Sequence, residues 1–160
     1  MFEYGSYKYG TRVAILRLNY AVEMRYGVLV DIGRKVFARE PVDVTMGSVN
    51  VIWQGDANSV CLRSFERCSS PPFVVNLTGV ERLSVREVAA EFGKRFGVEP
   101  VIGGKEADTA LLSNSSRMAS SFGSPQVAVS EMIEWIAQWI QSGGASHGKP
   151  THFETRDGRF

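Results

Sequence analysis

Two histidines near the carboxyl end come closest to a metal-binding pattern in this sequence. His147 and His152 flank a short segment of glycine, lysine, proline and threonine, and Glu154 and Asp157 follow. Imidazole nitrogens and carboxylate oxygens are ordinary ligands of divalent metals. A glycine-containing flexible tail holds such ligands poorly in place, so we predict no metal site there.

Glycine-rich turns that bind phosphate groups are absent from the sequence. No Gly-x-Gly-x-x-Gly or Gly-x-x-Gly-x-x-Gly pattern opens a strand and helix near Met1. Such a turn seats a dinucleotide pyrophosphate on a helix N-terminus. The run Gly103-Gly104-Lys105 lacks the next Ser or Thr and the upstream glycine of a nucleotide phosphate loop. There is also no Gly-x-Ser-x-Gly turn for a hydrolase.

Composition narrows the class of protein. The chain has 160 residues, 44% of them apolar, which suits one domain with a core. Its 18 Lys and Arg against 17 Asp and Glu give a net charge of +1, which favours neither a nucleic-acid nor an anionic membrane partner. No apolar run approaches the roughly 18 residues that span a bilayer, and the start does not resemble a secretory signal. We expect a cytoplasmic protein.

The two cysteines predict no disulfide. Cys61 and Cys68 stand seven residues apart on one predicted helix, which places them roughly 10 Å apart along its axis. That separation is too large for an S–S bond. We predict two buried or half-buried thiols in a reducing compartment.

Apolar runs and helical patterns alternate along the chain, which predicts an α/β fold with a few mainly parallel strands. The run at 12–20 is apolar almost throughout, as in a strand buried on both faces of a parallel sheet. The remaining predicted strands lie at 41–45, 49–54, 73–78 and 98–102. The predicted helices lie at 2–9, 26–39, 56–68, 84–96, 114–121 and 130–141. We predict one domain over 1–144 and an extended tail over 145–160.

Three polar residues are predicted to start helices. Asp56 and Ser130 each stand before a helical pattern, where a side-chain oxygen can accept a backbone N–H. Ser84 and Glu87 have the spacing of a capping box. Gly10 is predicted to close the first helix in a left-handed conformation.

The order of these segments resembles the carboxyl-terminal portion of the extended short-chain dehydrogenase/reductase family, the NAD-dependent epimerases and dehydratases. The run RVAILRLNYAV is similar to that family's strand ending in Leu-Arg, and IWQGD is similar to its Ile-His-Val-x-Asp junction. FVVNLTG followed by LSVREVAAEFGKRFG resembles its Tyr-Asn-x-Gly strand and the next helix. The resemblance implies an incomplete Rossmann-like fold that retains the substrate-binding half.

The family's catalytic Tyr-x-x-x-Lys pattern is matched literally by Tyr4 and Lys8. In the family, the tyrosinate takes a proton and the lysine lowers its pKa. The family also places two to three further helical turns between that lysine and the Leu-Arg strand, whereas only three residues separate Lys8 from Arg12. We therefore interpret the match as a coincidence and assign no catalytic residue.

The resemblance also implies a set of substrate-binding residues. The family's loop after the Leu-Arg strand carries an Asn and a Tyr-Gly-Pro turn; here Asn19 and Tyr20 follow the strand without Gly-Pro, and the Asn is one position early. Trp53 stands where many members have His, and no arginine for a nucleotide diphosphate occurs near it. Core packing of Trp53 and strand-end capping by Asn19 remain open alternatives. The candidate substrate-binding residues are Asn19, Tyr20, Met46, Asn50, Trp53 and Gln54.

Three functions remain open at this point. The chain is predicted to be a truncated epimerase-like protein that binds no cofactor alone and is inactive by itself. Alternatively, a missing segment with the NAD- or NADP-binding turn completes a working enzyme, or the chain is a small-molecule or protein binding module. An interior strand without its neighbours leaves an apolar sheet edge, so we expect a homo-oligomer.

Overall fold

The computed structural model describes residues 1–156 of the chain. Its helices are α1 (Phe2–Tyr9), α2 (Val28–Phe37), α3 (Gln54–Arg63), the 3-10 helix η1 (Ser64–Arg67), α4 (Val85–Phe96), α5 (Ser116–Phe122) and α6 (Val129–Gln141). Its strands are β1 (Ala14–Leu18), β2 (Ala21–Val22), β3 (Val42–Asp43), β4 (Ser48–Val49), β5 (Ile52–Trp53), β6 (Phe73–Leu77), β7 (Leu83–Ser84) and β8 (Ile102–Gly103). Helices and strands alternate, which confirms the predicted α/β class.

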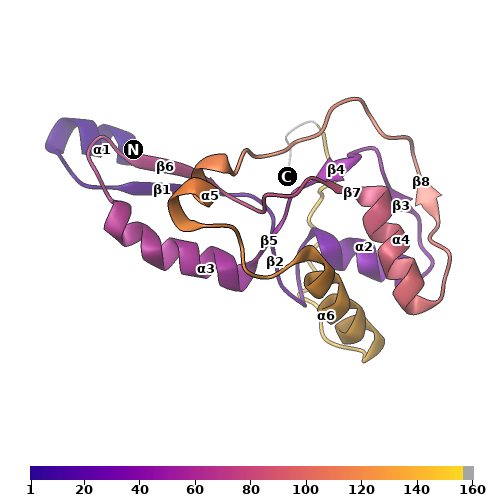
Figure 1. Cartoon of the computed structure of the whole chain (residues 1–160). Coiled ribbons are helices and arrows are strands. Elements are labelled where there is room, and N and C mark those ends of the chain that lie inside the picture. Colours follow the sequence, from indigo (N-terminus) through magenta and orange to yellow (C-terminus); the bar gives the residue numbers. More distant parts are fainter. Residues whose placement is uncertain (157–160) are drawn as a thin grey trace.

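Most strand pairs are parallel, as predicted. β1 pairs with β6 in register from Ala14 opposite Phe73 to Leu18 opposite Leu77. The pairs β2 with β5 and β3 with β8 are parallel and two residues long, whereas β4 and β7 are antiparallel. Figure 1 shows the β1 and β6 pair at one end of the molecule and α2, α4 and α6 at the other.

The surroundings of β1 correct one expectation from the sequence. Among the described residues β1 has a single neighbour, β6, and its side chains range from half-buried to exposed, with Leu18 58% exposed. The prediction of a strand buried on both faces is therefore wrong for this structure. Apolar side chains identified the strand but could not show that its second edge lacks a neighbour.

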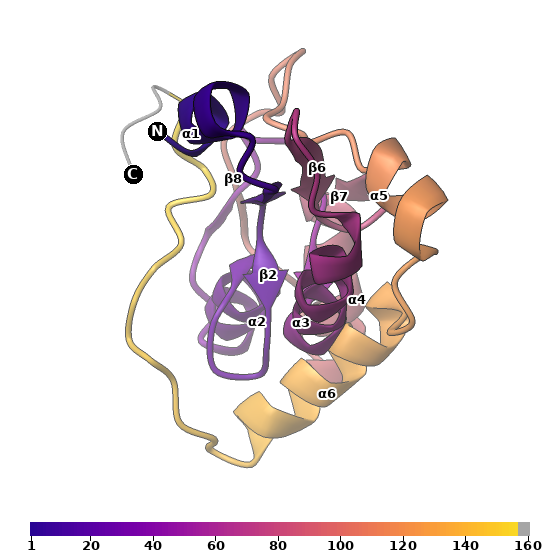
Figure 2. The same cartoon turned by 90° about the vertical axis from the view of Figure 1, so that its left-hand side faces the viewer.

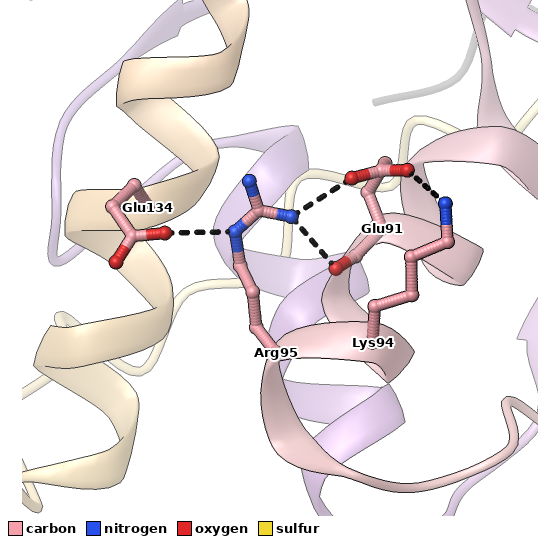
Figure 3. Close-up of polar contacts among 4 residues, drawn as sticks. All are labelled: Glu91, Lys94, Arg95 and Glu134. Carbon is pink, nitrogen blue, oxygen red and sulfur yellow. Dashed lines mark hydrogen bonds and ion pairs between the residues drawn. The ribbon is translucent and has the colours of Figure 1, made fainter.

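The larger of two apolar cores lies among α2, α4 and α6. All three helices are amphipathic, and each turns its apolar face towards the other two. Phe92 of α4 is fully buried there, and its ring stacks on that of Phe96. At the surface of this bundle, Arg95 of α4 bridges Glu91 of its own helix and Glu134 of α6 (Figure 3).

A smaller core lies beneath the β1 and β6 pair. It joins Val75 and Leu77 of β6 to residues of α3 and α5, including Met118 and Phe122. This smaller core contains seven buried residues, whereas the larger core contains twenty-one. This end of the molecule also carries α1, in which Ser6 alone is buried.

Of the three predicted N-cap residues, one caps its helix in the structure. Ser84 Oγ accepts the N–H of Glu87, as predicted for α4. Asp56 lies inside α3, whose N-cap is Trp53, and its carboxylate accepts the N–H groups of Gln126 and Val127 instead.

The last helix also begins differently from the prediction. Ser130 is its second residue, not its cap, because α6 starts after Ala128. The carboxylate of Glu131 reaches back and accepts the N–H of Ala128 at 3.0 Å. At the first helix, Gly10 takes the predicted left-handed conformation, with φ of 70°.

The cysteines lie near the smaller core. Both are free, which agrees with the prediction of no disulfide between them. Cys68 is half-buried, but Cys61 is exposed, so its predicted burial is wrong. Cys68 also lies beyond η1 rather than on the same α-helix as Cys61, because the helical turn tightens after Arg63.

Residues 145–156 run back along the molecule without regular secondary structure, past α2 (Figure 2). Thr151 donates its N–H and its hydroxyl to one carboxylate oxygen of Asp31, at 2.7 and 2.6 Å. Two residues later, Phe153 is 1% exposed and belongs to the larger core. We call 145–156 the strap, because it is tied to α2 and to the core.

Candidate functional site

Hydrogen bonds centred on Asn50 join the carboxyl ends of β1 and β6. Asn19 follows β1 and donates from Nδ2 to Asn50 Oδ1 at 3.1 Å. Thr78 follows β6 and donates its hydroxyl to the backbone oxygen of Asn50 at 3.2 Å. Open parallel sheets bind ligands beyond the carboxyl ends of their strands. This cluster is therefore the candidate site.

A second loop closes the cluster from the other side. Asn50 Nδ2 donates to the backbone oxygens of Ser113, at 2.7 Å, and Gly79, at 3.3 Å. The N–H of Ser113 returns a hydrogen bond to Asn50 Oδ1 at 3.4 Å, and Ser115 Oγ donates to the oxygen of Gly79. Each polar atom of the Asn50 carboxamide is thus engaged. A hollow of about 200 Å³ opens beside Asn50, lined by 80–82 and 112–116.

Gly79 allows the backbone to pass close to Asn50. A Cβ at this position would stand 2.0 Å from the backbone oxygen of Val51, far inside contact distance. Only glycine lets the chain leave β6 along this path. The close approach explains why the Gly79 oxygen can serve both Asn50 and Ser115.

Tyr20 lies next to this cluster in an unusual backbone conformation, with φ of 46°. Burial raises the pKa of its hydroxyl above the ordinary value, and the negative charge of Glu154 raises that pKa further. The hydroxyl therefore stays protonated at neutral pH. It can donate a hydrogen bond, but it is poorly suited to act as a base.

Met46 lies under the strap. It is 1% exposed, and its sulfur accepts the N–H of Leu111 at 3.3 Å. Arg156 of the strap reaches the same sulfur and donates to the backbone oxygens of Thr45 and Thr109. Met46 is thus buried beneath both the strap and the loop that contains Leu111.

The remaining two candidates stand apart from the Asn50 hydrogen bonds. Trp53 packs edge-to-face on Trp135 of α6, with ring centroids 5.2 Å apart. Gln54 is the exposed first residue of α3. The structure thus joins Asn19 to Asn50 by a hydrogen bond, and Tyr20 follows Asn19 in the chain. The other three candidates, Met46, Trp53 and Gln54, take no part in these hydrogen bonds.

Tyr4 and Lys8 lie at the opposite end of β1. Both are on α1, which precedes the amino end of β1, whereas Asn19 follows its carboxyl end (Figure 1). Tyr4 is 60% exposed, and the amino group of Lys8 lies 5.2 Å from its ring centre. A hydrogen bond with Tyr4, and then one with Tyr9, raises the pKa of Lys8.

Comparison with solved structures identifies the fold. UDP-glucose 4-epimerase from Thermotoga maritima matches with a TM-score of 0.69 and 15% identity, over 89% of this chain and 50% of the epimerase. UDP-glucuronic acid 4-epimerase from Bacillus cereus, in complex with NAD, matches at 0.69 and 14%, over 86% of this chain and 47% of that enzyme. GDP-mannoheptose C4 reductase from Campylobacter jejuni, with NADP bound, matches at 0.69 and 15%, over 87% and 52%.

The chain has the fold of these NAD(P)-linked epimerases and reductases, over about half of their length. No family model and no curated protein matches the sequence. At such low identity the match establishes the fold alone. The part of the predicted resemblance that is confirmed is a likeness of fold over about half the length of such enzymes; its assignment to their carboxyl-terminal portion stays a prediction.

Coenzyme binding in an epimerase-type fold requires a strand, a glycine-rich turn and a helix N-terminus. Among residues 1–156, a strand leads directly into a helix at α3 and at α4. Trp53 and Ser84 are the N-caps there, and the indole of Trp53 lies 3.0 Å from where a Cβ of Gly55 would stand. The residues at these two junctions do not fit a dinucleotide pyrophosphate.

The histidines of the strap do not assemble a metal site in the described part of the chain, where no group of three or more His, Cys, Asp or Glu could hold an ion. His147 Nε2 lies 3.5 Å from a carboxylate oxygen of Glu23. Asp157, the fourth residue considered, lies outside the described residues. Within 1–156, none of the helices is both long and apolar enough to cross a bilayer.

Sequence reasoning missed several residues of the Asn50 cluster. Thr78 and Gly79 follow a predicted strand directly, so their position at the carboxyl edge could have been found from the sequence. Ser113 and Ser115 could not, because they lie in a loop more than sixty residues from Asn50 in sequence. No local pattern marks such partners.

Proposed function

We propose that this chain is the substrate-side half of an NAD(P)-dependent epimerase- or reductase-like protein and catalyses no reaction alone. The observation that carries the proposal is the asymmetric match: nearly nine-tenths of this chain corresponds to about half of each enzyme. In a complete enzyme, the coenzyme supplies hydride transfer. The residues of this chain supply positioned polar groups at the carboxyl ends of β1 and β6.

The open edge of β1 supports the proposal. Val13 donates its N–H to the backbone oxygen of Ser69, which precedes β6, and Asn19 donates its N–H to that of Leu77, the last residue of β6. Backbone groups of a strand alternate in direction, so the N–H of Leu16 and Leu18 point to the other side, where the described residues provide no strand. Unpaired edge groups of this kind pair readily with another chain.

Helix α1 supports it as well. Its large side chains lie in solvent: Phe2, Tyr4, Tyr7 and Tyr9 are each at least 60% exposed. A helix of eight residues is marginal in water unless it packs an apolar face against something. An additional α/β layer against β1 and α1 would cover both features.

Coenzyme titration tests the inactivity of the chain. We expect no heat of binding when NAD or NADP is titrated into the purified chain, whereas the Bacillus cereus epimerase serves as a positive control. Micromolar affinity of this chain alone for either coenzyme would overturn the proposal. Activity that appears only when a coenzyme-binding polypeptide is added would support the alternative in which a second segment completes the enzyme.

A second copy of the chain is the partner we propose for the β1 edge when no other half is present. Leu18→Pro removes an edge N–H while leaving the alternate groups that face β6, and its side chain is exposed. We expect sedimentation equilibrium at tens of micromolar to show an oligomer for the unchanged chain and a monomer for Leu18→Pro. Arg17→Pro is the matched control, because it removes an N–H on the β6 side and should lower stability. A monomeric unchanged chain would contradict the homo-oligomer.

A further inference from the structure

A cavity of about 540 Å³ lies between α2, the end of α6 and the strap, the three elements that Figure 2 shows side by side. Its volume is that of an ordinary small-molecule site. None of the residues that line it takes part in the hydrogen bonds around Asn50. The lining residues with polar groups used below are Asp31, Arg34, Lys35, Glu40, Gly144 and Glu154.

Arg34 has few hydrogen bonds for a half-buried guanidinium. Its Nη2 donates to the backbone oxygen of Gly144 at 3.0 Å, and Trp139 Nε1 holds the next backbone oxygen, that of Ala145, at 2.9 Å. Arg34 Nε is buried and has no hydrogen-bond partner among residues 1–156, and a buried donor without a partner costs free energy. Arg34 Nη1 also donates to no described residue, and it is not buried. The side chain therefore presents a fixed positive charge with donors left for an anionic oxygen.

Asp31 stands one helical turn before Arg34 on the same face of α2, yet the two charges do not pair. Thr151 donates both of its hydrogen bonds to Asp31 Oδ2. Asp31 Oδ1 accepts none from the described residues and is not buried, so it has contact with solvent. Within 1–156, the ion pair at this cavity joins Lys35 to Glu154, at 3.9 Å. Asp31 and Arg34 thus form a cation and an anion on neighbouring turns, each without a counter-ion.

Apolar side chains form another part of the lining. Ile140 is buried, whereas Phe37 is 48% exposed and Pro150 of the strap is also exposed. The ring of Phe37 is held in place, because it packs edge-to-face on Phe96 with centroids 5.1 Å apart. The cavity therefore combines two opposite charges with an apolar surface that water now covers.

We propose that this cavity binds an α-amino acid with an apolar side chain. The ligand carboxylate accepts hydrogen bonds from Arg34, its ammonium group donates to Asp31 Oδ1, and its side chain covers Phe37 and Pro150. One carbon joins the two charged groups of an α-amino acid. Such a ligand can therefore reach both charges of α2 at once, without displacing Thr151 or Gly144.

The other charges of the cavity favour a zwitterion over a simple anion or a simple amine. The carboxylates of Asp31, Glu40 and Glu154 repel an anion that carries no ammonium group, and Arg34 and Lys35 repel an amine that carries no carboxylate. The inference goes beyond the proposed function and does not depend on it.

Amide resonances of the full-length chain provide the test. The ¹⁵N-labelled protein is titrated with L-phenylalanine and, separately, with phenylpropionate and phenylethylamine, which lack the ammonium and the carboxylate. We expect the backbone amides of Gly144 and Thr151 and the Nε–H of Arg34 to shift, and that of Thr78 to stay in place. The affinity for L-phenylalanine should exceed that for either analogue about tenfold, the value of one hydrogen bond to a charged group. Equal affinity for an analogue, or no response to L-phenylalanine, overturns the inference.

A matched pair of arginine variants separates binding at the cavity from binding elsewhere. Arg34→Gln removes the charge that holds the carboxylate, so the response to L-phenylalanine should be lost. Arg39→Gln is the control, because Arg39 follows the same helix, is exposed and does not line the cavity. We expect the control to respond as the unchanged chain does. A folded Arg34→Gln chain with unchanged affinity contradicts the inference.

If Arg34→Gln fails to fold without its bond to Gly144, Asp31→Asn decides. The asparagine keeps an oxygen that can accept both hydrogen bonds from Thr151, but it carries no charge for the ammonium group. We expect Asp31→Asn to bind L-phenylalanine no more tightly than phenylpropionate. A variant that still prefers L-phenylalanine about tenfold would show that Asp31 does not hold the ammonium group, and would overturn the inference. Coenzyme takes no part in these titrations, so they can fail while the proposed function stands, and the reverse.

Discussion

The two ends of this molecule differ in how many apolar side chains they bury. Around α2, α4 and α6, twenty-one buried apolar residues form a core that the strap covers. Around β1 and β6, seven buried residues support a strand pair with one free edge and a helix with exposed aromatic rings. The helical end buries most of its apolar side chains among its own elements, whereas the strand end leaves apolar side chains and one strand edge exposed within the described residues.

The candidate site lies where these two ends meet. Asn19 and Thr78 belong to the strand end, whereas Asn50 follows β4, which pairs with β7 in front of α4. Hydrogen bonds join the two ends at this point.

The largest difference in stability between the two ends is expected when one phenylalanine ring is removed from each core. Phe92→Ala empties a fully buried position and should cost about 3–5 kcal/mol of unfolding free energy. Phe122→Ala, at an 8% exposed position of the smaller core, should cost less, because neighbouring side chains and water can fill the gap. Urea unfolding followed by fluorescence measures both. Equal losses would mean that the two ends contribute alike to stability.

The next effect concerns the strap. Phe153→Ala should lower the free energy of unfolding by about 2 kcal/mol, which is the typical contribution of burying one large apolar side chain. We expect no larger loss, because the strap can detach without opening the helices. The same change should make the strap sensitive to limited proteolysis. Lys149→Ala is the control, since this exposed residue of the strap makes no side-chain hydrogen bond or ion pair among residues 1–156. A Phe153→Ala chain as stable and as protease-resistant as the control would contradict a structural role of the strap.

Much of the helical end could be predicted from the sequence, because its signals are local. The spacing of apolar residues over 85–96 predicts α4. Ser84 and Glu87, three residues apart, predict where the helix starts. The predicted cap at Asp56 failed because its partners are distant: its carboxylate accepts the N–H groups of Gln126 and Val127, about seventy residues away. Local rules cannot foresee such a partner.

The strand end was predictable in its elements but not in its surroundings. The apolar run at 12–20 correctly predicted β1, yet nothing in its side chains records how many strands stand beside it. The candidate site was likewise predictable in its residues but not in their contacts. Asn19 and Asn50 were each selected from the sequence, but their shared hydrogen bond depends on how loops 31 residues apart meet in space.

A cap variant gives a smaller effect within the helical end. Ser84→Ala should cost about 1 kcal/mol, because the N–H of Glu87 loses its partner. Ser130→Ala is the matched control, since Ser130 is exposed and lies inside α6 rather than at its cap. Chemical unfolding of the two variants side by side measures the difference. A larger loss for Ser130→Ala would reverse the assignment of the two caps.

The smallest effect comes from the ion pairs of Arg95, one of which, with Glu134, connects α4 to α6 (Figure 3). Hydrogen bonds from Gln138 and then Arg95 lower the pKa of Glu134 below its ordinary value, and those from Lys94 and then Arg95 lower the pKa of Glu91. A carboxylate whose pKa is lowered on folding stabilises the folded state above its unfolded pKa, which is near 4.5 here. That contribution is lost as the pH falls through the lower folded value.

Glu134→Gln should therefore lower the melting temperature slightly at pH 7 and leave it unchanged at a pH below the folded pKa of Glu134. The difference in melting temperature between Glu134→Gln and the unchanged chain should also become smaller in high salt, because these side chains are partly exposed and dissolved ions screen their charges. Glu66→Gln is the control, since Glu66 is exposed and makes no ion pair within the described residues. A difference in melting temperature that persists in acid would show that Glu134 acts through packing rather than charge. The contact between α4 and α6 would then depend on the apolar core alone.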